Sequence, residues 1–310
     1  MLLRRRATWL EGRYANVDGI PFTLPVRTQT SPALFAAFSI DPSAAQCMLP
    51  GQELHVCRVL KRGILIVAVV DYQDTTIGSY VEFCIGVLCT RGRRPAPPLL
   101  PLILQRSFGL GVYIYDLPVS TQISVKGGLG IWGMPKRQGN LDFRIDGATA
   151  SSQYDLDGRI VARIDVPKSR AIMPFVAAGA GYGSFRGLLG KSYINMRGRV
   201  GLSLGGGARL LIGDHPRAEI LRSLDIQPRP LMTGFVPQLD GVLEDHIETW
   251  FLTAGQLPPP PVVGMAEVID RPLSQDRLPP PDRAWSERLL RTLTSDQCVG
   301  RATRPALATL

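Results

Sequence analysis

The residue type in this chain that is best suited to covalent chemistry is lysine, and lysine is scarce. Among the 35 basic residues, the only lysines are Lys61, Lys126, Lys136, Lys168 and Lys191. A neutral lysine amine can attack a carbonyl group, whereas a guanidinium group stays protonated. Lys136 ends the apolar segment Gly-Ile-Trp-Gly-Met-Pro-Lys and precedes Arg137. Burial and an adjacent cation both disfavour the ammonium form, so this setting predicts a lowered pKa for Lys136; a solvated basic pair in a turn is the alternative.

Glu82 is the carboxylate that could act beside such an amine. It lies in the segment 79–88, whose composition is typical of a β-strand. Alternate side chains of a strand share one face, so Glu82 is expected to lie beside Tyr80 and Cys84 in a semi-apolar setting that raises a carboxyl pKa. Such a group could hold and release a proton near neutral pH. A solvated residue on a surface strand is the alternative.

The elements that must position these residues are mostly short strands. Period-two alternation predicts strands at 141–146 and 194–204, and a continuous apolar run predicts a strand covered on both faces at 64–72. Further strands are expected at 79–88, 111–115 and 160–166. Helices are expected at 217–224, 283–294 and 116–129, the last with Asp116 as its cap, Pro118 in its first turn, and Gly127 and Gly128 at its end. This pattern predicts an α+β fold that is mostly β, built around a barrel or strongly curved sheet with a few short helices.

The composition changes near Leu257, where the proline run 258–261 begins and a second run follows at 279–281. Proline runs favour extended segments over a packed core. We therefore expect a catalytic domain over residues 1–256, with its body ending near Phe251, and a Pro-rich C-terminal arm over residues 257–310 that has room for a short helix. The arm could wrap the body or a neighbouring subunit, and a flexible tail is the alternative.

Charge and cysteine content narrow the class of protein. The formal charge is +9, but the basic residues are scattered among acids and accompany no nucleic-acid-binding motif, so a solvated basic surface is expected. The longest apolar run, Ile64–Val70, is too short to span a bilayer as a helix. The N-terminus lacks the pattern of a secretory signal, and the five cysteines form no metal-binding or disulfide pattern. We expect a cytoplasmic protein without nucleic-acid or membrane partners and without a structural metal.

Two motifs together resemble the acetoacetate decarboxylase family. The stretch Trp132-Gly133-Met134-Pro135-Lys136-Arg137 is similar to the family motif that supplies a Schiff-base lysine and a neighbouring cation. Upstream, Tyr80-Val81-Glu82 resembles the family's Tyr-x-Glu strand, which bears an active-site carboxylate. A weaker similarity continues through 208–215 and 230–237, so that the resemblance covers roughly residues 12 to 250 and leaves the arm outside it.

The resemblance implies a fold, a reaction and a set of site residues. Lys136 would form an imine with a small β-keto acid such as acetoacetate, and the imine would accept the electron pair released with carbon dioxide. Arg137 would lower the pKa of the lysine, and Glu82 would orient substrate or handle a proton. Tyr80, Trp132 and Met134 are the candidates for lining the substrate pocket, and for Trp132 and Met134 core packing is the alternative. The resemblance also implies a homo-oligomer that needs no cofactor.

Two departures from the family pattern bear on the reaction. Family decarboxylases carry a Gly-Arg-Glu stretch before the motif, where this chain has Gly128-Leu129-Gly130. The family arginine that receives the substrate carboxylate aligns with Gly19, although Arg13 or Arg27 could replace it. The nucleophile is thus better defined than the reaction. Aldolase, dehydratase or hydratase chemistry on the same lysine, or a non-catalytic protein that binds a small acid, are the alternatives.

Overall fold

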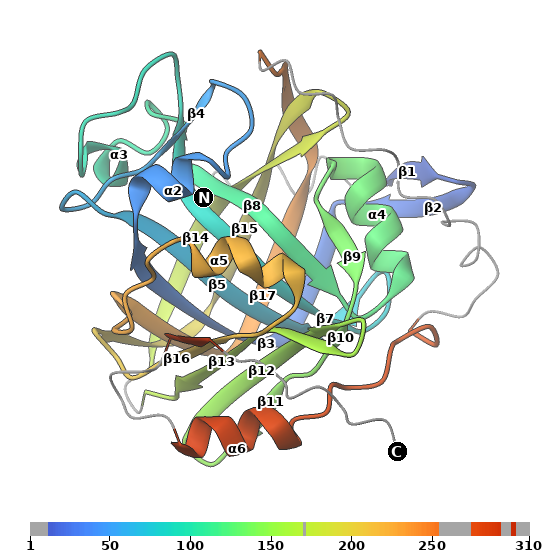
Figure 1. Ribbon diagram of the computed structural model, residues 1–310. Coiled ribbons are helices and arrows are strands. Elements are labelled where there is room, and N and C mark those ends of the chain that lie inside the picture. Colours follow the sequence, from blue (N-terminus) through green and yellow to red (C-terminus); the bar gives the residue numbers. More distant parts are fainter. Residues whose placement is uncertain (1–11, 170–171, 254–273, 293–298, 302–310) are drawn as a thin grey trace.

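The largest sheet of the protein closes on itself to form a barrel (Figure 1). The computed structural model describes residues 12–169, 172–253, 274–292 and 299–301. Seven strands follow one another around the ring in the order β7, β5, β3, β17, β15, β14 and β8, and β8 pairs again with β7. All neighbours are antiparallel except β14 and β8, which are parallel. The bounds are β3 (Val26–Ile40), β5 (Gly63–Tyr72), β7 (Tyr80–Arg91), β8 (Gly111–Val119), β14 (Met173–Phe185), β15 (Leu188–Leu204) and β17 (Met232–Phe251).

Smaller elements surround this barrel and complete a mostly β fold with few short helices, as predicted. β4 (Leu54–Val56), β6 (Asp74–Thr75) and β9 (Lys136–Gln138) pair with barrel strands, and β1 (Arg13–Val17) and β2 (Ile20–Leu24) form a separate hairpin. The helices beside the barrel are α2 (Pro42–Gln46), α3 (Leu100–Ile103), α4 (Gln122–Trp132), the 3₁₀ turn η1 (Pro216–Ala218) and α5 (Glu219–Arg222). No helix in the described part of the chain is both long and apolar enough to cross a membrane.

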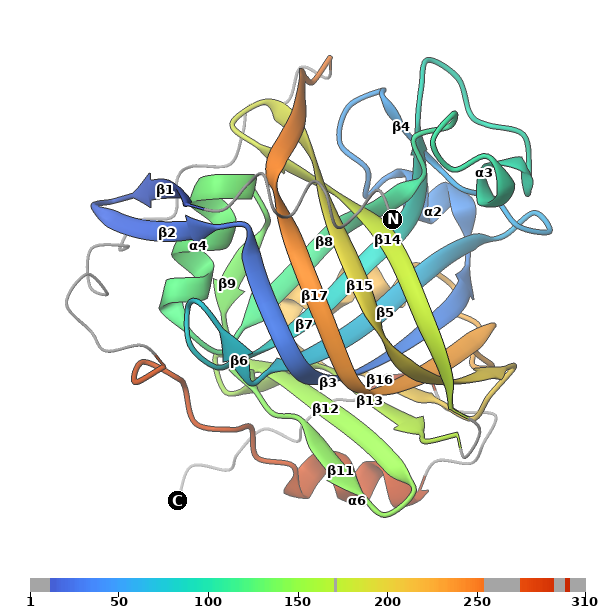
Figure 2. The ribbon, with the colours of Figure 1, turned by 180° about the vertical axis from the view of Figure 1, so that it is seen from behind.

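A second sheet packs against the outside of the barrel, below it in both views (Figures 1 and 2). It contains β10 (Asn140–Leu141), β11 (Arg144–Asp146), β12 (Thr149–Leu156), β13 (Arg159–Pro167), β16 (Arg209–Ile212) and β18 (Val299–Arg301). Phe83 and Ile85 of β7 belong to the same core cluster as Tyr154 of β12 and Ile164 of β13. Because strand side chains alternate, the opposite face of β7, which carries Tyr80, Glu82 and Cys84, points to the barrel interior.

The interior contains its own apolar cluster. Ile114 and Leu117 of β8 pack there with Trp132 and Met134, and Val26, Cys84, Leu243 and Ile247 pack against them. These residues come from β3, β7, β8 and β17, which do not all neighbour one another around the ring, so their side chains can meet only inside it. The barrel interior near α4 is therefore apolar.

The helix predicted at 116–129 begins later than expected. β8 continues to Val119, and α4 runs from Gln122 to Trp132 with Thr121 at its N-cap. Asp116 does not cap the helix, because it is buried in an ion-pair cluster, and Pro118 lies in the strand rather than in a first helical turn. Gly127 and Gly128 lie inside the helix, and Gly133, at φ +62°, ends it.

The strand predicted at 141–146 is interrupted. β10 ends at Leu141 and β11 begins at Arg144. Between them, the Asp142 carboxylate accepts a hydrogen bond from the Gln153 backbone N–H and pairs with Arg283 and Arg144. These side-chain interactions interrupt the strand pairing, and the alternation of Leu141, Phe143 and Ile145 does not reveal them. The strands predicted at 64–72, 79–88, 160–166 and 194–204 are confirmed within β5, β7, β13 and β15.

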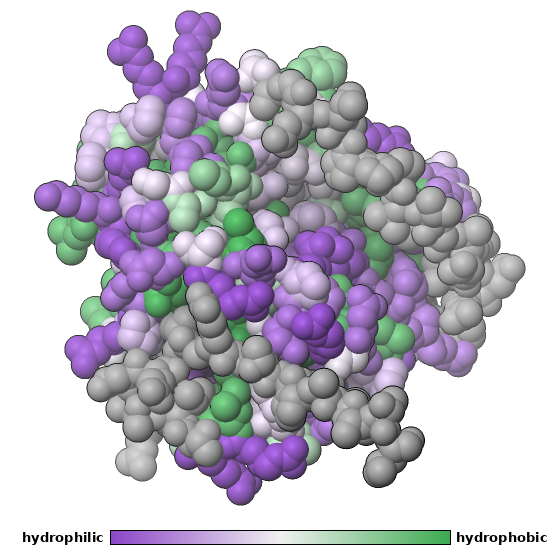
Figure 3. Space-filling view, viewed as in Figure 1, coloured by the Kyte–Doolittle hydropathy of each residue, from purple (hydrophilic) through white to green (hydrophobic). Residues whose placement is uncertain are grey.

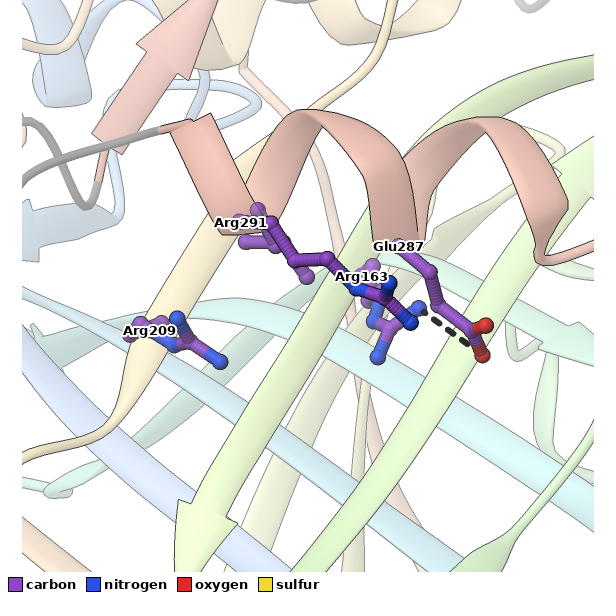
Figure 4. A pocket seen from close by; sticks show the side chains of 5 residues that line it. Arg163, Arg209, Glu287 and Arg291 are labelled. Atoms are coloured by element: carbon purple, nitrogen blue, oxygen red, sulfur yellow. Dashed lines mark ion pairs between the residues drawn. The ribbon is translucent and has the colours of Figure 1, made fainter.

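The described part of the C-terminal arm runs across the second sheet, forms α6 (Ala284–Thr292), where a helix at 283–294 was predicted, and contributes β18 to that sheet. Leu290 of α6 packs on Leu211 of β16. Figure 4 shows Glu287 and Arg291 of α6 above Arg163 and Arg209 of the sheet, with an ion pair of 3.9 Å between Arg163 and Glu287. Asp165 also pairs with both sheet arginines, at 3.0 and 3.4 Å.

Arg283 is the buried link between the arm and the second sheet. Its guanidinium pairs with Asp142 and donates to Ser151, and only 5% of Arg283 and 7% of Asp142 are exposed. We expect Arg283→Ala to lower the free energy of unfolding by about 3 kcal/mol, because it leaves a buried carboxylate without its main partner. Urea unfolding measures the effect. Arg288→Ala, at an exposed position of the same helix, should change it by less than about 0.5 kcal/mol; equal effects of the two variants would contradict the prediction.

Candidate active site

Lys136 enters the barrel interior from β9. This short strand pairs in parallel with the end of β8, where Lys136 is in register with Leu117 of the interior cluster. Gly133 turns the chain from α4 into the segment that leads to β9. Lys136 and Leu117 face the same way, so the aliphatic part of the lysine extends toward the interior, and only 6% of its side chain is exposed.

Polar side chains of β7 and α4 contact the Lys136 amine. Its Nζ lies 2.7 Å from Oε2 of Glu82 on β7 and donates a hydrogen bond of 3.0 Å to Oγ of Ser124 on α4. The same nitrogen lies 5.3 Å from the ring centroid of Tyr80. The lysine and the carboxylate that the sequence analysis selected are thus in direct contact, although they are far apart in the sequence.

The electrostatic setting of Lys136 differs from the predicted one. Burial disfavours its ammonium form, as expected, but the nearby Glu82 carboxylate and Tyr80 outweigh burial and raise the pKa of Lys136 above its ordinary value. The expectation of a lowered pKa was wrong for this state of the site. The sequence analysis placed Glu82 near the lysine without allowing for the effect of a contact at 2.7 Å.

Arg137 does not act on the lysine in the predicted way. Successive side chains of a strand point to opposite faces, so Arg137 leaves β9 on the side away from the interior. Its Nε lies 2.9 Å from Oδ1 of Asp116, whose other oxygen lies 3.2 Å from Nε of Arg217. Asp116 is only 1% exposed and also accepts a hydrogen bond from Tyr154. Arg137 therefore anchors β9 to β8 and to the turn η1.

Two further groups of β5 and β7 surround Glu82. The Tyr72 hydroxyl donates to Oε1 of Glu82 at 3.4 Å, and Tyr72 and Tyr80 are cross-strand partners whose ring centroids are 4.6 Å apart. Burial, with a smaller contribution from Glu82, raises the pKa of Tyr72 well above its ordinary value. Burial also raises the pKa of Cys84 to about 12, so this thiol stays protonated near neutral pH. Tyr72 and Cys84 thus stay neutral beside Glu82, and Lys136 is the cation that it contacts.

The three residues predicted to bind substrate occupy different places. Tyr80 lies against the Lys136 amine. Trp132 and Met134 lie in the interior cluster, which Cys84 also contacts, and the Trp132 indole donates to the Glu244 carbonyl oxygen of β17 at 3.1 Å. This hydrogen bond fixes the end of α4 to the barrel wall. Trp132 and Met134 are therefore core residues of the interior as well as neighbours of the site.

The sequence analysis missed Ser124, Tyr72 and Gly128. Ser124 and Gly128 lie four residues apart, on one face of α4, and both contact Lys136. Their place in a helix was predicted, but the face that meets the lysine depends on where the helix packs. Tyr72 could have been found from the register of the β5–β7 hairpin, which pairs it with Tyr80.

Gly128 leaves room for the lysine side chain. A Cβ atom at this position would overlap Cδ and Cε of Lys136. We expect Gly128→Ala to displace the amine and to lower the rate of adduct formation with an oxo acid by about 10²-fold, because small displacements of a reacting group cost that much. Gly130→Ala is the matched control in the same helix, since its Cβ would meet Val17 instead. Equal losses in both variants would indicate general overpacking rather than displacement of Lys136.

The C-terminal arm braces the elements that hold the site. The Asp276 carboxylate accepts from the Gln122 amide at the start of α4, and the Asp276 carbonyl accepts from the Gln138 side chain of β9 at 2.6 Å. Ser274 donates to the Ser79 carbonyl, next to Tyr80, at 2.9 Å. A segment remote in sequence thereby fixes the helix that carries Ser124 and the strand that carries Lys136.

The positions considered for a carboxylate-binding arginine do not converge on Lys136. Gly19 lies in the turn between β1 and β2 at φ +84°. Arg13 is largely exposed and pairs with Asp245 at 2.9 Å. Val26 contacts the interior cluster, so its neighbour Arg27 points to the other face of β3. None of these three positions places a guanidinium beside the amine.

The comparisons with known proteins agree with the class that this barrel and its buried lysine suggest. A family model described as acetoacetate decarboxylase matches residues 14–179, which is more than half of the chain. The protein belongs to the acetoacetate decarboxylase family. The matched segment contains Glu82, Ser124 and Lys136 but not the C-terminal arm. A comparison with curated protein sequences gives no match.

Several solved structures share the fold at low sequence identity. Acetoacetate decarboxylase from Legionella pneumophila is similar with a TM-score of 0.55 and 15% identity, over 74% of this chain and 86% of that chain. The enduracididine biosynthesis enzyme MppR, complexed with pyruvate, is similar with a TM-score of 0.52 and 15% identity, over 73% and 90%. An acetoacetate decarboxylase-like enzyme from Sphingomonas wittichii RW1 gives 0.53 and 14%, over 77% and 100%. These likenesses establish the fold.

Proposed function

We propose that this protein is a Schiff-base-forming lyase that decarboxylates a small β-keto acid, such as acetoacetate, through an imine on Lys136. The observation that supports the proposal best is the contact of one buried amine with one carboxylate, 2.7 Å apart, inside an apolar barrel of this family. Amine and carboxylic acid together are the groups that imine formation requires. The chemistry needs no metal or organic cofactor.

The first step in this proposal is formation of the neutral amine. A proton moves from Nζ of Lys136 to Oε2 of Glu82 across their contact. This transfer converts an ion pair into a neutral pair without changing the total charge, so the burial that disfavours isolated ions does not oppose it. The raised pKa of Lys136 describes the paired ammonium, and the reactive form arises by transfer within the pair.

The reaction then proceeds on the nitrogen. The amine adds to the ketone carbon, the hydroxyl group of the adduct takes a proton from Glu82 and leaves as water, and a protonated imine remains. When carbon dioxide departs, the electron pair of the broken C–C bond moves to the imine nitrogen and gives an enamine. Protonation of its carbon restores the imine, and hydrolysis releases the ketone and the free lysine. Ser124 and Tyr80 would orient the nitrogen during these steps.

The arginine positions favour a second candidate reaction. Decarboxylation of a bound acid benefits from a cation on its carboxylate, and Gly19, Arg13 and Arg27 do not supply one beside Lys136. An enamine formed on the same lysine could instead attack an aldehyde. The structural relative MppR has been observed with the condensation product of pyruvate and imidazole 4-carboxaldehyde. Aldol or hydration chemistry on an oxo acid is therefore the runner-up.

The products distinguish the two candidates. The protein is incubated with acetoacetate, and separately with pyruvate and an aromatic aldehyde, and the carbon dioxide and the condensed product are measured. Release of carbon dioxide from acetoacetate supports the lyase. A condensed product without gas supports the aldolase. A folded sample that forms neither, and that binds oxo acids without forming an adduct, contradicts both and supports a binding protein.

A further inference from the structure

An exposed apolar tip lies at the end of the barrel where α3 is found. Six apolar residues are exposed there: Leu60, in the turn before β5, and Leu99, Leu100, Leu102, Ile103 and Leu104, in and around α3. Leu60 is 81% exposed and Ile103 is 78% exposed. The backbone amide of Leu99 bonds to the Arg58 carbonyl at 3.3 Å, which joins the two segments into one surface. Both views show the turn and α3 side by side (Figures 1 and 2).

The two segments that form this tip also carry exposed cations. Arg58, Lys61, Arg93, Arg94 and Arg106 are exposed in the same two segments. We call these five residues and the six apolar ones the α3 surface. In Figure 3, strongly hydrophilic side chains stand next to apolar ones over this region, at the upper left. Exposed leucine and isoleucine flanked in the chain by Lys and Arg are the pattern of a segment that enters the interface of a bilayer.

The charged residues of the α3 surface are all basic. The chain has no Asp or Glu at residues 54–70 or 83–115, which include both segments. None of the five cations makes an ion pair within the described residues. The carboxylates next to these two segments have partners of their own. Asp225 pairs with Arg62 at 2.7 Å, and Glu53 accepts a hydrogen bond from the Thr253 backbone N–H at 3.1 Å. The field at this surface is therefore positive and is not neutralised locally.

We propose that the α3 surface docks this protein on an anionic lipid bilayer, with the apolar tip in the interface and the five cations on the lipid headgroups. A symmetric contact with a second copy would bring the two sets of cations together, which disfavours self-association here. The loop is stiffened by Pro95, Pro97, Pro98 and Pro101, so docking orders little additional chain. This peripheral contact differs from membrane spanning, and it revises the expectation that the protein has no membrane partner.

Vesicle co-sedimentation of the full chain tests the proposal. One set of vesicles contains phosphatidylcholine alone, and the other contains equal parts of phosphatidylcholine and phosphatidylglycerol. We expect binding to the anionic set, weakening as salt rises, and little binding to the neutral set. Arg93→Gln/Arg94→Gln should weaken binding about tenfold or more, and Leu102→Ser/Ile103→Ser/Leu104→Ser should weaken it at least as much.

Matched controls separate the α3 surface from general charge and hydrophobicity. Arg199→Gln/Arg288→Gln removes the same charge from exposed positions of β15 and α6, and Val176→Ser/Leu204→Ser removes exposed apolar side chains, 73% and 83% exposed, from β14 and β15. Both should bind like the unchanged protein. Thermal unfolding checks that every variant is folded.

Four results would overturn the proposal. The first is absence of binding to anionic vesicles, and the second is equal binding by the α3-surface variants and the controls. The third is a change of oligomeric state by the α3-surface variants in sedimentation velocity without any vesicle binding, which would assign the surface to a second copy. Binding of an acidic peptide in place of anionic vesicles would likewise assign it to a protein partner.

Discussion

Replacing Lys136 with alanine should reduce turnover of every oxo acid that the protein accepts to the uncatalysed background. In the proposed mechanism the imine forms on this nitrogen, so its removal leaves no nucleophile for that step. Because the loss of Lys136 leaves Glu82 without its cation, Lys136→Arg is the more informative variant. It keeps a positive charge beside Glu82 but cannot form an imine. Turnover is measured as product formed over time, by carbon dioxide release or by condensation.

Lys126→Arg is the matched control. Lys126 lies on α4 and is buried, with its Nζ 2.7 Å from Oδ2 of Asp18 rather than at the site. It should retain turnover close to that of the unchanged protein. If Lys136→Arg also retained turnover, the lysine would act only as a cation, and the covalent mechanism would be wrong.

Glu82→Gln should produce the second large effect, in two separable parts. Without the carboxylate, burial dominates the setting of Lys136, so its pKa should fall. The neutral amine is then present at lower pH, and the midpoint of the pH profile for adduct formation should move to lower pH. Turnover should nevertheless fall by about 10²–10⁴-fold, because the group that transfers protons in the carbinolamine and imine steps is lost.

Arg137→Gln separates this effect from a general effect of nearby charge. Arg137 pairs with Asp116 on the far side of β9, so its loss should leave the midpoint of the pH profile in place and should lower the stability of the protein instead. The midpoint could instead move in Arg137→Gln and stay in place in Glu82→Gln. Arg137, as the sequence analysis predicted, and not Glu82 would then be the residue that perturbs the pKa of Lys136.

The strands were predictable in part, because alternation and apolar runs report directly on strands. β5, β7 and β15 of the barrel and β13 of the second sheet lie where the pattern placed them, whereas the barrel strands β3 and β14 were not predicted. The start of α4 was missed because Asp116 and Pro118 have the residue types of a helix start, whereas burial of Asp116 between two arginines keeps this segment in β8. Local sequence preference was outweighed there by a contact with Arg217, about a hundred residues away in the chain.

Two residues of the candidate site were predictable, but the contacts that form the site were not. The motifs identified Lys136 and Glu82, but their contact follows from the way β9 joins β8 and β8 joins β7 around the barrel. The direction of Arg137 followed from strand alternation once β9 was known, yet the sequence analysis had assigned no strand there. The contacts of Ser124 and Gly128 with Lys136 depend on which face of α4 packs against the barrel, and no sequence motif indicates that face. The bracing contacts of Asp276 come from outside the family segment.

Reductive trapping tests the central claim most directly. The unchanged protein is incubated with acetoacetate, pyruvate or acetylacetone, the mixture is reduced with borohydride, and the adduct is located by peptide mapping. The account predicts one stable amine adduct, on Lys136, that is absent in Lys136→Arg. The other four lysines provide an internal control, since each lies elsewhere in the chain. A folded protein that forms no adduct with any of these compounds, or an adduct on another lysine, would contradict the account.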